Sequence, residues 1–109
     1  MYTTTDIQIV TSIIKKNLAG SCLEIFLFGS YAKNTAQQDS DLDIAIILDK
    51  KIAREEKLET LNKLWWETSQ KGYSVDFLFK SAHDYEEEKS LPTISRVIAR
   101  EGKSLWKKN

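Results

Sequence analysis

Two short apolar runs, joined by a polar connector, restrict what this chain can fold into. The first run, residues 25–28, stops abruptly at a Gly-Ser pair, and the second, residues 44–48, follows a segment that contains two acids. Apolar runs of this length, bounded by turn residues, are typical of buried strands. We therefore expect residues 23–28 and 41–48 to form two strands of one sheet.

The two acids before the second run have the spacing of one face of a strand. If residues 41–48 are extended, Asp41 and Asp43 point to the same side, because side chains alternate with a period of two. Their Cα atoms then lie about 6.6 Å apart, from a rise of about 3.3 Å per residue. Carboxylates in this arrangement can converge on Mg²⁺, which takes one or two of them together with waters and phosphate oxygens.

The Gly29-Ser30 pair is typical of a junction between a strand and a short helix, here residues 29–35. Glycine lets a ligand approach the backbone, because it has no Cβ. The first amide groups of a helix are unpaired and favour phosphate, and the Ser30 hydroxyl adds a further donor. With the two acids, this junction predicts a phosphate cradle beside a metal site.

A third acid lies in another predicted strand. Asp76 interrupts the apolar run of residues 74–79. A carboxylate inside a central strand is costly unless it meets a cation or a hydrogen-bond partner. Beside the strand of Asp41 and Asp43, it would complete a site of three carboxylates.

These positions form a signature that is quite specific as a set. It combines a Gly-Ser-x-Ala turn, a Ser-Asp-x-Asp segment and a lone strand acid: Gly29, Ser30, Ala32, Ser40, Asp41, Asp43 and Asp76. The signature resembles that of the nucleotidyltransferase superfamily of DNA polymerase β type. In length the chain is similar to its minimal members, the antitoxin halves of HEPN–MNT toxin–antitoxin pairs. The resemblance implies an α/β (α+β) fold: one nucleotidyltransferase domain over residues 1–109, with a mixed sheet and helices mainly on one face.

The resemblance also implies a reaction and a role for each residue. AMP would pass from ATP to a hydroxyl, and two Mg²⁺ ions would stabilise the entering and leaving oxygens. Asp76 would also help to deprotonate the attacking hydroxyl. The catalytic and metal-binding residues would be Asp41, Asp43 and Asp76, and the nucleotide-binding residues would be Gly29, Ser30, Lys33 and Ser40.

The chain departs from the family pattern at two positions. Members usually continue the Gly-Ser-x-Ala turn with Arg-Gly, where this chain has Lys33 and Asn34. Lysine keeps the positive charge but loses the planar fork of arginine. Asparagine tolerates the left-handed backbone conformation better than most residues other than glycine. We interpret both changes as mild.

Several functions are compatible with this signature. The leading hypothesis is an antitoxin, similar to those of type VII systems, that transfers AMP to a tyrosine of a HEPN toxin. One alternative is an antitoxin that neutralises its partner by binding alone, and a less favoured one is an aminoglycoside-type nucleotidyltransferase. Without any ligand, the acids would be only turn and cap residues, and Ser40 is as well suited to shaping a turn as to touching substrate.

Composition limits the partners and the compartment. The 109 residues suit one domain, and their formal net charge of zero argues against direct nucleic-acid binding. No apolar run approaches the roughly 20 residues of a membrane span. The single cysteine, Cys22, and the absence of a signal-peptide pattern favour the cytoplasm.

Three other segments have helical spacing. The first begins at a capping-box pattern, Thr5 to Gln8, and is expected to end at Gly20. The longest, residues 50–70, leaves the exposure of Trp66 open. Its expected apolar stripe consists of Leu58, Leu61, Leu64 and Trp65.

The C-terminal third predicts smaller elements. Residues 81–89 are expected to form a loop or an exposed helix, and a last helix is expected to open at Leu91 and Pro92 and to end at Gly102. In that helix, Ile94, Val97 and Ile98 are expected to be buried. After it, Leu105 and Trp106 are expected to dock on the core, and residues 107–109 are expected to form a frayed tail.

Overall fold

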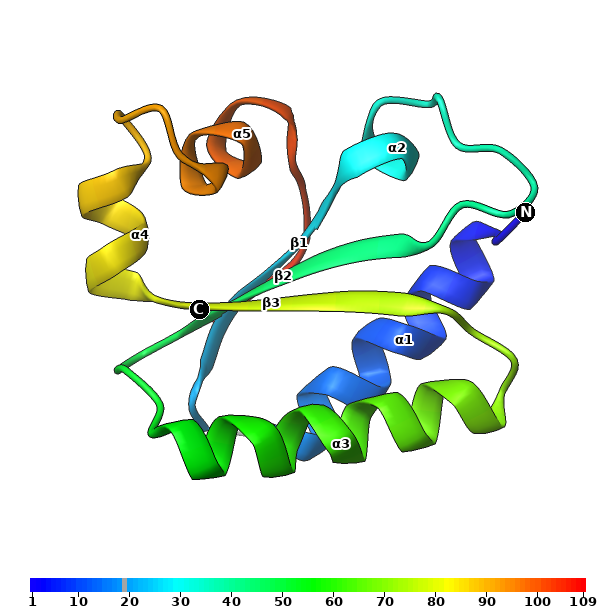
Figure 1. Cartoon of the computed structure of the whole chain (residues 1–109), viewed down its shortest axis with the longest axis horizontal. Coiled ribbons are helices and arrows are strands. Elements are labelled where there is room, and N and C mark those ends of the chain that lie inside the picture. Colours follow the sequence, from blue (N-terminus) through cyan, green and yellow to red (C-terminus); the bar gives the residue numbers. More distant parts are fainter. Residues whose placement is uncertain (19) are drawn as a thin grey trace.

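A four-stranded sheet lies between helices on its two faces (Figure 1). The computed structural model describes residues 1–18 and 20–109, and no helix in them is long and apolar enough to cross a membrane. The elements in these residues are α1 (Thr4–Asn17), β1 (Cys22–Phe28), α2 (Gly29–Ala32), β2 (Leu42–Leu48), α3 (Arg54–Gln70), β3 (Val75–Ser81), α4 (Ala82–Glu88), α5 (Ile94–Glu101) and β4 (Lys103–Lys107).

The sheet is mixed, as the sequence predicts. Its strand order is β3-β2-β1-β4, with β1 antiparallel to both β2 and β4. Strand β3 is parallel to β2, because α3 carries the chain back to the starting end of the sheet between them. The strands β3 and β4 are therefore the two edges.

The buried strand β2 supplies side chains to both faces. In accordance with the period of two, alternate residues belong to two separate apolar clusters. One cluster lies against the two longest helices, α1 and α3, and confirms that the main helical layer covers one face. The short helices α4 and α5 cover part of the other face. The first cluster takes Leu42, Ile44, Ile46 and Leu48 of β2, and the second takes Ala45 and Ile47.

The predicted first helix is correct in kind but begins earlier. The capping box joins Thr3 and Asp6, not Thr5 and Gln8 as predicted, so the helix starts at Thr4. Thr3 and Asp6 form both hydrogen bonds of the capping box: the Thr3 hydroxyl accepts from the Asp6 amide, and the Thr3 amide donates to the Asp6 carboxylate. The helix ends at Asn17; residue 19 lies outside the described residues, and Gly20 beyond it has a φ of +88°.

The apolar stripe of α3 is narrower than predicted. Leu61, Leu64 and Thr68 are its buried residues, whereas Leu58 and Trp65 are exposed. The helix lies at the margin of the layer and contacts α1 along one side (Figure 1), so only one line of residues reaches the core. Trp66 is 68% exposed, which settles its position in favour of the surface.

The C-terminal predictions need three corrections. Helix α5 begins after Thr93, two residues later than expected, and Ile94 and Val97 are exposed while Ser95 and Ile98 are buried. Residues 103–107 form the edge strand β4, in which Leu105 and Trp106 pack against the core as predicted, whereas Lys107 belongs to the strand and not to a frayed tail. Strand β4 has only five residues, and its two apolar residues are adjacent, so its pattern lacks the alternation that distinguishes a strand from a loop.

We expect Asp6→Ala to lower the melting temperature at neutral pH. Hydrogen bonds from Thr3 and from the Tyr73 hydroxyl, the latter 2.9 Å long, hold the pKa of Asp6 below its ordinary value. A lowered folded-state pKa stabilises the fold above the unfolded-state pKa and loses that effect as the pH falls through the folded-state value. The difference between wild type and variant, measured by thermal unfolding at several pH values, should therefore shrink as the pH falls below 3.8, the ordinary pKa of the carboxyl group.

Asp39→Ala, which removes an exposed acid of the loop before β2, is the matched control and should leave the melting temperature unchanged. An equal loss in both variants, or a loss that persists at low pH, would contradict the role of Asp6.

Candidate active site

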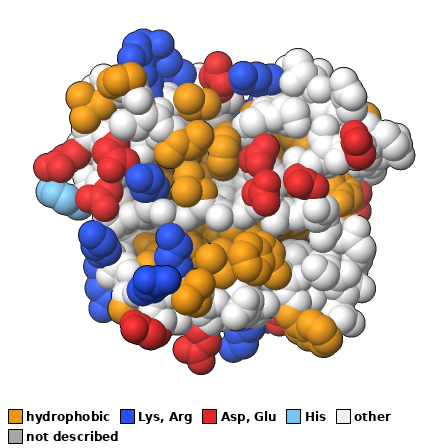
Figure 2. Space-filling view, viewed as in Figure 1, with side chains coloured by type: hydrophobic (Ala, Val, Ile, Leu, Met, Phe, Trp, Pro, Cys, Tyr) orange, Lys and Arg blue, Asp and Glu red, His pale blue; other side chains and the backbone are white. Residues whose placement is uncertain are grey.

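The parallel pairing of β2 and β3 brings two of the predicted acids side by side. Asp43 is the register partner of Asp76, so their Cα atoms lie on adjacent strands about 4.8 Å apart. Asp41 comes directly before β2, two residues from Asp43. All three acids therefore lie where the two parallel strands begin, and Figure 2 shows acidic side chains gathered right of centre on this side of the molecule.

Strand β3 is an edge strand, which corrects the expectation that Asp76 lies inside a central one. Asp76 and Asp41 are exposed, and Asp43 is half-buried. Hydration stabilises the charges of the two exposed carboxylates, so they need no buried partner. The acids occupy an open edge of the sheet, which is accessible to a large ligand.

Asp43 lies on the face of the sheet that α4 and α5 partly cover. Its partner in β1, Phe28, packs against the second apolar cluster, to which Ala45 of β2 also belongs. Helix α2 follows Phe28 directly and projects on the same side as α5 in Figure 1. The turn into α2 and the carboxylate of Asp43 therefore meet on one face.

The close contact between this turn and Asp43 requires glycine at position 29. Its φ is +73°, a conformation that L side chains rarely adopt. A Cβ on Gly29 would overlap Oδ2 of Asp43 and lie 2.9 Å from its Cγ. The glycine thus leaves room for the carboxylate of Asp43.

Burial raises the pKa of Asp43, and the nearby charges of Asp76 and Asp41 raise it further. Both effects disfavour the charged form of Asp43, and a bound cation would offset them. Among the described residues no three His, Cys, Asp or Glu side chains are already assembled around one point. The donors nevertheless fit a hard divalent cation in chemical type and in their place on the sheet.

The predicted nucleotide-binding residues differ in their surroundings. Helix α2 is a single turn, shorter than residues 29–35, and the Ser30 carbonyl accepts a hydrogen bond from the Thr35 amide. Lys33 forms an ion pair with Glu101, 3.2 Å long and exposed on both sides. The Ser40 hydroxyl accepts a hydrogen bond from the Gln37 amide at 2.8 Å, so it shapes the turn before β2.

Asn34 stands in the left-handed region, with a φ of +60°. Glycine, the residue of the family pattern at this position, adopts this region freely. Asparagine is among the few other residues that adopt it at low cost. The interpretation of this departure as mild is consistent with the backbone geometry.

A tyrosine cluster beside the site could not be foreseen from the sequence. Tyr2 stacks on Tyr31 of α2 at 5.8 Å and meets the ring of Tyr73 edge to face at 5.5 Å. Its hydroxyl accepts a hydrogen bond from the Ser74 amide, and its amide donates to the Tyr31 hydroxyl. The cluster links α2 to the entrance of β3, next to Asp76. Tyr31 is thus a packing residue, one of the two roles that the sequence allowed.

The single cysteine is not placed for nucleophilic chemistry. Cys22 is buried at the start of β1, and burial raises the pKa of its thiol to about 11. His83 is exposed on α4 and lies 3.3 Å from Glu87. A thiol that stays protonated is a weak nucleophile.

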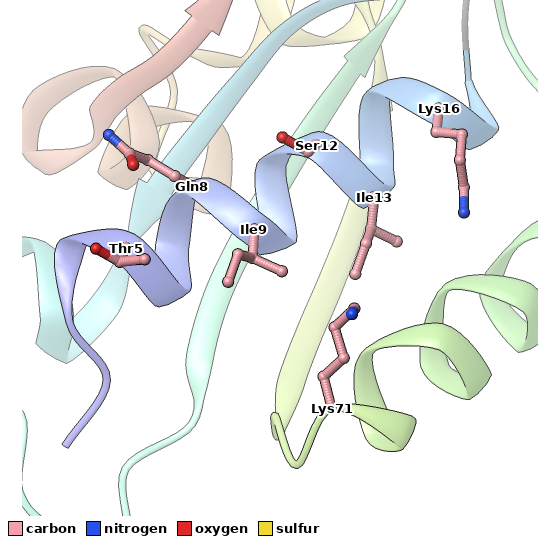
Figure 3. A pocket seen from close by; sticks show the side chains of 7 residues that line it. All are labelled: Thr5, Gln8, Ile9, Ser12, Ile13, Lys16 and Lys71. Carbon is pink, nitrogen blue, oxygen red and sulfur yellow. The ribbon is translucent and has the colours of Figure 1, made fainter.

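A groove elsewhere on the surface contains none of the predicted site residues. Figure 3 shows Ile9 and Ile13 of α1 pointing toward the turn after α3, where Lys71 lies. The groove has a volume of about 340 Å³. It is open to solvent and contains none of the three acids, so we do not assign the reaction to it.

The chain belongs to a known family. The sequence profile described as "Nucleotidyltransferase domain" matches residues 8–104. This is a nucleotidyltransferase domain. The matched segment contains the turn at Gly29, all three acids and the first two residues of β4. The comparison with curated proteins returned no match.

Solved structures share this nucleotidyltransferase fold at low sequence identity. A toxin–antitoxin crystal structure with AMP-PNP is 22% identical, with a TM-score of 0.64, over 95% of this chain and 74% of that one. A Shewanella oneidensis complex of a tri-AMPylated HEPN toxin with an MNT antitoxin is 22% identical, with a TM-score of 0.60, over 95% and 71%. The MntA–HepT toxin–antitoxin structure is 19% identical, with a TM-score of 0.56, over 94% and 70%.

Asp43→Asn should raise the melting temperature of the metal-free nucleotidyltransferase at pH 7 by a few degrees. Asparagine keeps the shape of the side chain but removes its repulsion with Asp76 and Asp41. A raised folded-state pKa favours folding at low pH and weakens it as the pH rises. The gain should therefore disappear well below 3.8, the ordinary pKa of the carboxyl group.

Thermal unfolding with and without Mg²⁺ checks this expectation. Mg²⁺ should stabilise the wild type and have little effect on Asp43→Asn, whereas Asp39→Asn should respond as the wild type does. If Mg²⁺ does not change the melting temperature of the wild type, that result would contradict a cation site at these acids.

We expect Asn34→Gly to leave stability unchanged and Asn34→Ala to reduce it. Alanine has no side-chain oxygen to support the left-handed conformation, which costs about 1 kcal/mol. In a domain of this size that corresponds to a fall of about 4–8 °C in melting temperature. Equal melting temperatures for the two variants would contradict the positive φ of Asn34.

Proposed function

We propose that this nucleotidyltransferase moves AMP from ATP to a hydroxyl group in a Mg²⁺-dependent reaction. The observation that carries the proposal is the register of β2 and β3, which sets Asp43 beside Asp76. Asp41, directly before β2, and the tight turn at Gly29, against Asp43, complete the arrangement. Such a set of carboxylates suits phosphoryl and nucleotidyl transfer, in which positioning and charge stabilisation provide most of the rate.

Each residue has a distinct part in this proposal. Asp41 and Asp43 would hold two Mg²⁺ ions, whose charge stabilises the entering and leaving oxygens of an in-line displacement. Asp76, exposed on the edge strand, is accessible to the acceptor and would accept the proton of its hydroxyl. Gly29 and Ser30 would contact the triphosphate through the backbone of the α2 turn. Lys33 and Ser40 remain candidates for nucleotide contacts once their present partners are exchanged.

The proposed acceptor is a tyrosine of a HEPN-type toxin. The complex of a tri-AMPylated HEPN toxin with an MNT antitoxin supports this choice, because that antitoxin shares the fold of this chain. The structure with AMP-PNP supports an adenine nucleotide as donor. The chain would act as an antitoxin in the cytoplasm, where ATP is available and a free thiol such as Cys22 stays reduced.

The test is the intact mass of a purified HEPN-type toxin after incubation with this protein, Mg²⁺ and each nucleoside triphosphate. We expect a gain of one or more AMP units with ATP. The Asp41→Ala/Asp43→Ala variant should be at least about a hundredfold slower, because it loses several kcal/mol of charge stabilisation. Asp39→Ala/Asp49→Ala removes two exposed acids outside the site and should retain full activity.

A second candidate function is neutralisation of the toxin by binding alone. The exposed side chains of Leu58, Trp65 and Trp66 on α3 favour it, since aromatic residues often anchor protein interfaces. A stable complex formed equally by wild type and Asp41→Ala/Asp43→Ala, with no mass gain in either, would establish this function in place of transfer.

A further inference from the structure

The strands that carry the acids where they begin carry lysines where they end. A pocket of about 130 Å³ lies at the far ends of β2 and β3 and the start of α3. Figure 2 shows Lys and Arg side chains left of centre, with acidic side chains beside them at the left margin. The charged and hydroxyl-bearing residues that line the pocket are Lys51, Lys57, Lys80, Ser81 and Asp84.

The pocket has an excess of positive charge. Lys80 is balanced by Glu88, with 2.8 Å between Nζ and Oε1. Within residues 1–18 and 20–109, no carboxylate lies within 4.0 Å of the ammonium groups of Lys51 or Lys57. Asp84 contributes one negative charge to the lining, so Lys51 and Lys57 outnumber it even when Lys80 is discounted. Asp49 and Glu56 lie on the adjoining surface, where they line a neighbouring pocket together with Lys51.

A hydroxyl donor is also available in the pocket. The Ser81 oxygen accepts a hydrogen bond from the Asp84 amide at 3.1 Å, as the cap of α4. A serine hydroxyl has one proton to donate, and no acceptor for that proton is present in the described part of the chain. Ammonium groups and a hydroxyl are the donors that proteins use for phosphate oxygens.

We propose that this pocket binds a phosphate group, through Lys51, Lys57 and the Ser81 hydroxyl. Its volume of about 130 Å³ is below the roughly 300–1,000 Å³ of pockets for drug-sized ligands, so it takes a compact anion and not a whole nucleotide. The site is separate from the proposed active site, because β2 and β3 run from the acids at one end to the pocket at the other. It does not depend on the proposed transfer reaction.

The test is a titration of the full chain with inorganic phosphate, followed by ¹H–¹⁵N NMR. The solution contains EDTA, so that no metal can bridge phosphate to the acids, and sodium chloride keeps the ionic strength constant. We expect saturable shifts of the Lys51 and Ser81 amides. In Lys51→Gln/Lys57→Gln the dissociation constant should rise about tenfold or more, since two charge-assisted contacts are lost.

Two comparisons separate this site from general charge effects and from the active site. Lys63→Gln/Lys103→Gln removes the same charge from exposed lysines elsewhere and should bind phosphate as the wild type does. Asp43→Ala should also bind normally, whether or not it transfers AMP. Equal weakening in both double-lysine variants, or shifts confined to the segment between Gly29 and Asp43, would overturn the proposal.

A second ligand identifies the source of the phosphate. Ethyl phosphate is a phosphate monoester, so it presents the phosphate as a phosphorylated larger molecule would. Binding as strong as that of inorganic phosphate assigns the site to a phosphate borne on a larger molecule, and its exclusion assigns the site to the free anion. Failure of both ligands to shift Ser81 would overturn the proposal.

Discussion

The parallel register between β2 and β3 is the constraint on which the candidate site depends. Because the side chains of a strand alternate, a slip of one residue would turn Asp76 to the opposite face from Asp43. The register is held by the core: Leu42, Ile44 and Ile46 are fully buried under α1 and α3, so β2 cannot shift without exposing them. The hydrophobic pattern that stabilises the sheet thus also fixes the spacing of the carboxylates.

The contact between Gly29 and Asp43 joins the turn into α2 to the acids of β2 and β3. The turn at Gly29 ends a strand that is antiparallel to β2, so the last residue of β1 meets the start of β2. Without a Cβ at Gly29, the half-buried carboxylate fits against the turn. Burial of the Asp43 carboxylate, and then its repulsion with Asp76 and Asp41, disfavour the charged form of Asp43 and raise its pKa.

The sequence predicts most of what lies between residues 23 and 81, and less of the rest. Residues such as Ile44 and Asp76 are informative because uninterrupted apolar runs and isolated acids each have few structural explanations. The stripe of α3 was misjudged at Trp65, since helical spacing gives the direction of a side chain but not how much of the helix the core covers. The edge strand β4 and the contact of Tyr2 with Tyr31 depend on packing between distant segments, which no local pattern records.

The opposite charges at the two ends of β2 and β3 have a consequence for how the molecule meets its ligands. The formal net charge is zero, yet Asp41, Asp43 and Asp76 lie at one end of these strands, and Lys51 and Lys57 lie at the other beside the acids of α4. Such charge patches act over about one Debye length, roughly 8 Å at physiological ionic strength, so a charged ligand responds to the nearest patch and not to the net charge. The association rate of charged ligands should therefore depend on added salt, although a calculation from net charge alone predicts no dependence.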